Sequence, residues 1–395
     1  MGNVNGRNLI ICCDGTNNEF GPENTNIVRL IQVLQRDPQT QRLYYDPGVG
    51  TLPNPGAFTA LAKRLSEYWE LAFATDLPDR VSNAYRYLMD VWEPGDCVFL
   101  FGFSRGAYTA RVLAGVLYLL GLMPRGGSNM IPYVMRLFGS LRGHAQREQA
   151  KSSKKNYWEL CNEFRWTFAR PIPGYATDNR HFRVHFLGAW DTVSSVGWVW
   201  DPKRYPFTAR NPGIDVIRHA VSLDERRAFF RQNLVSKESP KQDLVEIWFP
   251  GVHSDVGGGY PETESALWRL SFEWMLGEAQ KSGLLVDQKR FAEVLQQTMP
   301  SQQPWAAPKH ESLTPAWWPA EFFPKLAFRP TPGRSLPRLN LGRRRYVPSG
   351  ALIGKEILQR IRSGQPNHAP QNLSADFQRR VAALSSVPHF VPYVP

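Results

Sequence analysis

The residues with the clearest chemical meaning form the string Gly102-Phe103-Ser104-Arg105-Gly106. This Gly-x-Ser-x-Gly pattern follows an apolar run that is typical of a buried strand, and an apolar pattern of helical period comes after it. A nucleophile elbow needs that context, because a sharp strand-to-helix turn exposes the serine hydroxyl above the sheet. Gly102 and Gly106 allow neighbouring elements to approach a strained backbone. The pattern therefore predicts that Ser104 is a nucleophile.

A neutral serine is a poor nucleophile, so it needs a histidine that takes its proton and a carboxylate that fixes the tautomer of the histidine. In hydrolases with this elbow, the acid and then the histidine follow the serine along the chain. Asp191 and His253 each come after an apolar run that is typical of a strand. We therefore predict a triad of Ser104, Asp191 and His253. Asp255 is the competing acid, although its closeness to His253 in sequence makes the usual geometry awkward.

Acyl transfer also requires N–H donors for the oxyanion. The backbone N–H of Arg105 is expected to be one of them, because this residue opens the helix after the serine. The string Asp14-Gly15-Thr16-Asn17-Asn18 follows the first apolar run. We expect Gly15 or Thr16 to be the second donor, with Asp14 in support. An Asx-type turn without a catalytic part explains the same residues equally well.

Strand and helix patterns alternate along the chain. Strands are expected over residues 8–13, 42–45, 97–103, 182–189 and 244–249, and helices over residues 27–35, 77–92, 107–120, 265–281 and 288–298. This alternation predicts a mostly parallel sheet flanked by helices, and the elbow makes the expected fold α/β-hydrolase-like. In such sheets, ligands bind beyond the carboxyl ends of the strands, where the predicted triad residues fall.

The chain is expected to divide into an α/β-hydrolase domain over residues 1–300 and an extension over residues 301–395. Residues 129–168 look helical but have no counterpart in a minimal α/β unit, so we expect a helical cap inserted at about residues 125–175. The extension holds 14 of the 32 prolines, and regular structure is expected to be sparse until about residues 351–361. It also holds the aromatic residues Trp305, Trp317, Trp318, Phe322 and Phe323.

The net charge of +12 is concentrated in the extension, which carries 3 Lys and 10 Arg against 4 acidic residues. A solvated basic surface explains this charge, and so does a surface that attracts anionic lipid headgroups. Aromatic residues of the extension and the cap could line an apolar wall or contact a membrane, and ordinary packing explains them equally well. Peripheral membrane contact is therefore one expectation, and nucleic-acid binding is not expected.

Targeting and cysteine patterns also limit the interpretation. No apolar run approaches the roughly 20 residues of a spanning helix, and residues 1–7 lack the apolar core of a secretory signal. We expect a cytoplasmic protein, or one delivered by a secretion system that needs no signal peptide. The four cysteines form no Cys-x-x-Cys pair or Cys/His cluster, which argues against a disulfide scaffold or a zinc site. No cofactor or metal is expected.

Four blocks of the sequence are similar to a known family. The blocks are Cys13-Asp14-Gly15-Thr16-Asn17-Asn18, Gly102-Phe103-Ser104-Arg105-Gly106-Ala107-Tyr108-Thr109-Ala110-Arg111, Trp190-Asp191-Thr192-Val193 and Pro250-Gly251-Val252-His253-Ser254-Asp255-Val256-Gly257-Gly258-Gly259-Tyr260. Over about residues 7–280, the chain resembles the α/β-hydrolase domain family, formerly of unknown function, that includes the phospholipase effectors of type VI secretion. The resemblance implies the same triad and an ester of a lipid or phospholipid as the substrate. For an effector, it also implies a delivery or immunity protein as a partner.

Two other functions stay open on the sequence alone. Asp14, His253 and Asp255 could bind a metal ion for phosphoester hydrolysis, because carboxylates and imidazole suit such ions. A catalytically silent protein could instead keep the fold and use its basic extension to hold a membrane or another partner. The motifs favour a serine hydrolase that cleaves a carboxylic ester through an acyl-enzyme.

Overall fold

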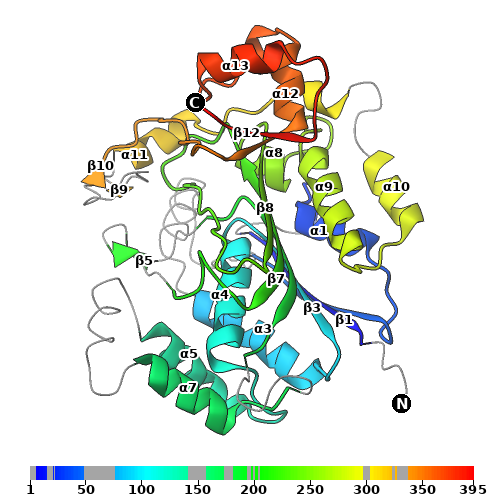
Figure 1. The fold of residues 1–395 in the computed structure, drawn as a ribbon, viewed down its shortest axis with the longest axis vertical. Coiled ribbons are helices and arrows are strands. Elements are labelled where there is room, and N and C mark those ends of the chain that lie inside the picture. Colours follow the sequence, from blue (N-terminus) through cyan, green and yellow to red (C-terminus); the bar gives the residue numbers. More distant parts are fainter. Residues whose placement is uncertain are drawn as a thin grey trace, which may run out of the picture.

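Eight strands form the central sheet of the computed structural model, which describes residues 6–15, 21, 23–48, 76–140, 157–172, 181–193, 197–198, 201–202, 205–296, 303–322, 325–326 and 337–395. They are β1 (Asn8–Cys13), β2 (Gln41–Asp46), β3 (Cys97–Phe103), β4 (Val184–Trp190), β7 (Ile214–Ser222), β8 (Asp243–Phe249), β11 (Leu352–Gly354) and β12 (Phe390–Pro392). Their order is β12-β11-β8-β7-β4-β3-β1-β2, and each neighbouring pair is parallel except β11 with β12 (Figure 1).

Helices flank this sheet. They are α1 (Asn26–Val33), α3 (Leu77–Val91), α4 (Arg105–Leu120), α5 (Ile131–Gly139), α7 (Tyr157–Phe168), α8 (His253–Gly257), α9 (Trp268–Lys281), α10 (Gln288–Gln296), α11 (Trp318–Glu321), α12 (Lys355–Arg362) and α13 (Ala375–Ala382). Short elements are η1 (Ser128–Met130), η2 (Pro304–Ala306), η3 (Pro315–Trp317), η4 (Pro366–His368), and the strand pairs β5 (Gly197–Trp198) with β6 (Asp201–Pro202) and β9 (Lys325–Leu326) with β10 (Pro337–Arg338). The predicted α/β fold with a mostly parallel, helix-flanked sheet is confirmed.

Two apolar cores lie on the two faces of the sheet, because successive strand residues point to opposite sides. In β1, Leu9 and Ile11 join the core that includes α3 and α4. Ile10 and Cys12 join the core that includes α1 and α9. A strand that is buried on both faces reads as a continuous apolar run, which is why the sequence predicts β1 and β3 with their observed bounds.

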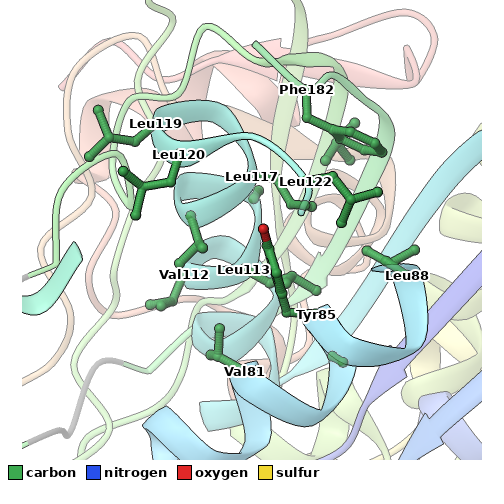
Figure 2. Close-up of a cluster of buried hydrophobic side chains, with 14 of the residues drawn as sticks. Val81, Tyr85, Leu88, Val112, Leu113, Leu117, Leu119, Leu120, Leu122 and Phe182 are labelled. Atoms are coloured by element: carbon green, nitrogen blue, oxygen red, sulfur yellow. The ribbon is translucent and has the colours of Figure 1, made fainter. Parts of the chain in front are cut away.

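The packing of α3 against α4 fixes the helix that begins at the elbow. Val81 and Leu88 of α3 and Leu113 of α4 are fully buried in this cluster (Figure 2). Tyr85 is buried among them, and its hydroxyl donates a hydrogen bond of 2.8 Å to the carbonyl of Gly121, which ends α4. Side chains of α3 thus pack against α4 and hold its C-terminal end.

The sequence periodicity does not predict β7. Asp215, Arg218 and His219 interrupt its apolar pattern, so the segment looks like a polar connection. In the structure, Arg218 pairs with Glu278 at 2.6 Å, and His219 Nδ1 lies 2.8 Å from the Glu246 carboxylate. These partners come from distant segments, and they allow charged residues to occupy a central strand.

In the segment that is expected to form the cap, the structure describes η1, α5 and α7, and α5 and α7 lie together at one end of the molecule (Figure 1). Residues 141–156 and 173–175 of the expected cap lie outside the described residues. Among the helices that are described, none is long and apolar enough to cross a bilayer.

The extension starts with little regular structure and then continues the main sheet. Only η2, η3 and α11 lie within residues 303–322, whereas β11 and α12 begin at the position where the sequence predicts regular structure to resume. β11 pairs with β8, and β12 pairs with β11. Ile353, Leu358 and Phe377 of the extension bury a third core together with Val221 and Trp248 of the sheet. The division at residue 300 stays a prediction, but these contacts join the extension to the sheet.

Candidate active site

Ser104 lies in the sharp turn between β3 and α4. Its backbone has φ 58° and ψ −123°, which is a conformation that costs a non-glycine residue about 1–3 kcal/mol and that clusters at functional sites. A Cβ atom on Gly102 would lie 2.4 Å from Ala107 Cα, and one on Gly106 would lie 2.1 Å from the carbonyl oxygen of Cys13. Both glycines are therefore required by close backbone approach. This is the strand-turn-helix geometry that the motif predicts.

The substitution Gly106→Ala is expected to lower the free energy of unfolding by about 1–3 kcal/mol, because the new methyl group overpacks the turn against β1. Urea unfolding of the purified chain measures this loss. Gly277→Ala is a matched control, since a Cβ atom there meets nothing within 4 Å in helix α9, and it should raise stability by about 0.5–1 kcal/mol. Equal unfolding midpoints for Gly106→Ala and the unmodified chain would contradict the tight turn.

Asp191 and His253 form a buried pair. Asp191 follows β4 with φ 39°, and His253 is the first residue of α8, after β8. The Nδ1 atom of His253 lies 2.5 Å from Asp191 Oδ2, and the two residues are 3% and 1% exposed. The imidazole stacks on the Phe103 ring at a centroid distance of 4.7 Å, and the Phe230 ring lies edge-on to the imidazole at 4.8 Å. These rings and the carboxylate fix the orientation of the imidazole.

Backbone hydrogen bonds place Ser104 beside this pair. Its N–H donates to the carbonyl of Trp190 at 3.0 Å, and the N–H of Val193 donates to the Ser104 carbonyl at 3.2 Å. Ser104 is therefore bonded to residues on both sides of Asp191. Within the described ranges, no hydrogen bond joins the Ser104 side chain to His253, whose bond to Asp191 is made by Nδ1 and not by Nε2. Catalytic hydrogen bonds often tighten only when substrate binds.

The charge state of the pair suits proton transfer. Burial disfavours the Asp191 carboxylate, but the charge of Arg345 and the hydrogen bonds from His253 and Arg345 outweigh burial and hold the pKa of Asp191 well below its usual range. Burial lowers the pKa of His253, although Asp191 favours the imidazolium. At neutral pH the site therefore holds an ionised carboxylate and a neutral imidazole, which can accept a proton.

The expected oxyanion donors have different surroundings. Arg105 is the first residue of α4, so its N–H lies at the N-terminal end of that helix, directly after Ser104. The N–H of Gly15 donates to Asp14 Oδ1 at 2.7 Å, and Thr25 Oγ1 donates to Asp14 Oδ2 at 2.8 Å. In this arrangement Gly15 supports Asp14, and a role in the oxyanion hole stays a prediction for Gly15. Thr16 lies outside the described residues.

Asp255 has a partner other than His253. Its Oδ1 atom lies 2.6 Å from Nδ1 of His310, and its Oδ2 atom accepts the N–H of Val252 at 3.0 Å. Asp255 is fully buried, and its bond to His310 ties α8 to the extension. Asp255 therefore supports the helix of His253 and does not compete with Asp191 for the imidazole.

The residues of the alternative metal site are not grouped together. Asp14 bonds to Thr25, His253 bonds to Asp191, and Asp255 bonds to His310. In the part of the chain that the structure describes, no group of three or more His, Cys, Asp or Glu side chains could hold a metal ion. The geometry therefore gives no support to a site made of Asp14, His253 and Asp255.

Several polar residues of the site are not predicted from the sequence. Ser222 donates to the Asp191 carboxylate through its N–H at 2.9 Å and its hydroxyl at 3.0 Å. Arg345, in the extension, binds the same carboxylate. Glu225 accepts the N–H of His253 at 3.2 Å. Burial disfavours the Glu225 carboxylate, but the charge of Arg227 and hydrogen bonding outweigh burial and lower the pKa of Glu225 to about 2.

A comparison with protein families gives a match to the family described as T6SS, phospholipase effector Tle1-like, catalytic domain, over residues 7–278. The chain belongs to this family. The match contains Ser104, Asp191 and His253 and ends before Arg345.

The chain is also similar to individual proteins. The uncharacterized protein YEL023C of Saccharomyces cerevisiae is 36% identical over 234 residues, which are 58% of this chain and 32% of that protein. The chain thus spans about a third of the length of this relative. An uncharacterized protein from Pseudomonas aeruginosa has a solved structure that is similar with a TM-score of 0.39 and 18% identity, over 71% of this chain and 47% of the other. The Tle1 effector bound to the VgrG spike of the type 6 secretion system gives a TM-score of 0.30 and 20% identity, over 65% and 52%.

Proposed function

We propose that the chain is a serine hydrolase that cleaves a carboxylic ester of a lipid or phospholipid. One observation carries the proposal: the buried pair of His253 and Asp191, joined at 2.5 Å, lies beside the strained elbow of Ser104. The membership in a family of phospholipase catalytic domains supports a lipid ester as the substrate class.

In the proposed reaction, His253 Nε2 takes the proton of Ser104 Oγ while Oγ attacks the acyl carbon of the ester. The backbone N–H of Arg105 stabilises the oxyanion, and the imidazolium then returns the proton to the leaving alcohol. Water enters next and attacks the acyl carbon while His253 takes a proton from it. The imidazolium then returns this proton to Ser104 Oγ as the bond from Oγ to the acyl carbon breaks and the fatty acid leaves. Asp191 holds Nδ1–H throughout and so keeps Nε2 as the base.

The pH dependence of kcat/KM should show the buried state of His253. Since burial lowers the pKa of this imidazole, the neutral base persists to a lower pH than the ordinary histidine value of 6.5. We expect the acid limb of kcat/KM on a soluble ester to have its midpoint below pH 6.5. A limb centred above that value would indicate a different base or a protonated resting state.

The nature of the products tests the bond that is cleaved. The full chain is incubated with a phospholipid that carries two different acyl chains, and the products are identified by mass spectrometry. Carboxylic ester cleavage gives a free fatty acid and a lysophospholipid, and the acyl chain that is released identifies the position. Diacylglycerol or phosphatidic acid would instead indicate phosphoester cleavage and would contradict the proposal.

Peripheral membrane contact through the cap is part of this proposal. Tyr133 of α5 and Phe168 of α7 are 40% and 45% exposed, and both rings contact the buried Phe164 ring. Arg136 lies over the Tyr133 ring, which adds a cation beside the exposed aromatic side chains. Such a surface suits the headgroup region of a bilayer, where aromatic rings and cations are favoured. The extension exposes a second set of apolar side chains, namely Trp318, Phe322, Leu339, Leu341 and Tyr346.

Phe168→Ser should weaken binding to phospholipid vesicles by roughly tenfold or more, because burial of a phenylalanine side chain is worth about 1.5–3 kcal/mol. Vesicle sedimentation measures the binding. The rate on a soluble short-chain ester should stay at the wild-type level, since Phe168 lies outside the site. Unchanged vesicle binding would show that the cap does not contact the membrane.

Delivery by type VI secretion, with a delivery or immunity protein as partner, also belongs to the proposal, because the family is one of type VI effectors. Export of the chain from strains with and without a working secretion machine tests this route. Equal export from the two strains would contradict it.

A further inference from the structure

Arg345 of the extension forms a two-pronged ion pair with the acid of the site. Its Nη1 atom lies 2.5 Å from Asp191 Oδ1, and its Nη2 atom lies 3.0 Å from Asp191 Oδ2. The two residues are 154 positions apart, and they are 6% and 1% exposed. This fork is the geometry in which an arginine fixes both the position and the plane of a carboxylate.

The guanidinium is itself held by groups at the end of β7 and beyond. Nη1 donates to Ser222 Oγ at 2.8 Å and to the Ser222 carbonyl at 3.0 Å, and Nη2 donates to the Phe230 carbonyl at 2.5 Å. Phe230 is the residue whose ring lies edge-on to His253. Arg345 therefore joins the acid, the strand beside it and one wall of the imidazole.

The extension anchors the backbone around Arg345. The Asn372 side chain donates to the carbonyl of Arg345 at 3.2 Å and to the carbonyl of Leu223 at 3.0 Å. Val347, two residues further on, is 4% exposed in the core that the extension shares with the sheet. The position of the guanidinium thus depends on the packing of the extension.

The charge of Arg345 acts on the acid, and through the acid it should also affect the base. Among the described residues, charged groups near His253 include Asp191 at the end of β4 and Glu225 and Arg227 after β7. Asp255 lies in the same helix and binds His310, and Arg345 binds Asp191. A carboxylate that is paired with a buried guanidinium stabilises a neighbouring imidazolium less than an unpaired carboxylate would. Removal of the guanidinium should therefore favour the imidazolium.

We propose that Arg345 is a positioning residue, whose guanidinium holds the Asp191 carboxylate in the plane in which it binds His253 Nδ1. The role rests on the proposed serine hydrolase function. It makes the extension part of the active site, although the family match ends before it.

Histidine NMR spectra of the full chain test the proposal, with the His253 signal assigned by its loss in His253→Gln. The imidazole is titrated in the wild type, Arg345→Met, Arg345→Lys and Arg343→Met. Arg343 is the matched control, because its side chain is exposed two positions away. In Arg345→Met we expect the pKa of His253 to rise by about one unit or more, and kcat to fall by about 10²-fold with KM unchanged. Arg343→Met should match the wild type in the pKa of His253, in kcat and in KM.

Arg345→Lys separates charge from geometry, and it serves if Arg345→Met does not fold. Lysine keeps the positive charge but cannot form the fork, so we expect a pKa of His253 near the wild-type value and a kcat lowered by roughly tenfold. A wild-type kcat in Arg345→Lys, or the same pKa of His253 in Arg345→Met and the wild type, would overturn the proposal. The titration does not require the chain to hydrolyse an ester. A chain that hydrolyses no ester would therefore refute the proposed function, but the titration would still test the contact of Arg345 with the acid.

Discussion

Ser104→Ala is expected to lower kcat for ester hydrolysis by about 10⁶-fold, because loss of the nucleophile removes the acyl-enzyme route and leaves only oxyanion and binding effects. The Ala side chain keeps the Cβ atom, so the turn between β3 and α4 should persist. Initial rates on a soluble ester measure the loss, and near-UV circular dichroism checks the fold.

Ser82→Ala is a suitable control for this variant. Ser82 lies in α3, where its hydroxyl donates to the carbonyl of Pro78 at 2.7 Å, and its loss should leave kcat unchanged. If folded Ser104→Ala kept more than a tenth of the wild-type kcat, catalysis would have to use another group. A metal-dependent reaction would then be the main alternative, and a chelator would abolish the activity.

Asp191→Asn should lower kcat by about 10⁴-fold, because an amide at this place favours the wrong tautomer of the histidine. The same variant should lose about 3–5 kcal/mol of stability, since it leaves Arg345 as a buried charge without a counterion. Both effects arise from one carboxylate, but they are measured separately, by steady-state kinetics and by urea unfolding.

Asp215→Asn is the matched control for the loss of a carboxylate. Asp215 pairs with Arg183, and the side chains are 38% and 39% exposed. An exposed ion pair is worth about 0–1 kcal/mol, so this variant should keep both its stability and its kcat. If Asp191→Asn were as stable as Asp215→Asn, the buried ion pair with Arg345 would not exist in solution.

Much of the fold and three residues of the candidate site can be predicted from local sequence patterns. The continuous apolar run of β3 and the glycines around Ser104 predict the elbow, because both depend on neighbours within a few residues. Asp191 and His253 could be predicted because parallel strands end at one edge of the sheet, so polar residues that follow strands meet there. The structure brings these two side chains within hydrogen-bonding distance.

The rest of the site depends on contacts between distant segments. Arg345 belongs to a run of three arginines in which Arg343 is exposed and Arg345 is buried, and no local pattern separates them. Ser222 ends β7, and the sequence does not predict this strand because charged residues interrupt its apolar pattern. Their partners lie on other segments of the chain. Composition can show that the extension is basic, but it cannot show which of its cations faces a buried carboxylate.

The most direct test of the central claim is covalent labelling of the full chain with a fluorophosphonate, followed by intact mass and peptide mapping. The wild type should gain one label on Ser104, Ser104→Ala should gain none, and His253→Ala should label far more slowly. The exposed His389 supplies the control, since His389→Ala should label like the wild type. A folded wild type that takes no label, or takes it on another residue, would contradict the assignment of Ser104 as the nucleophile.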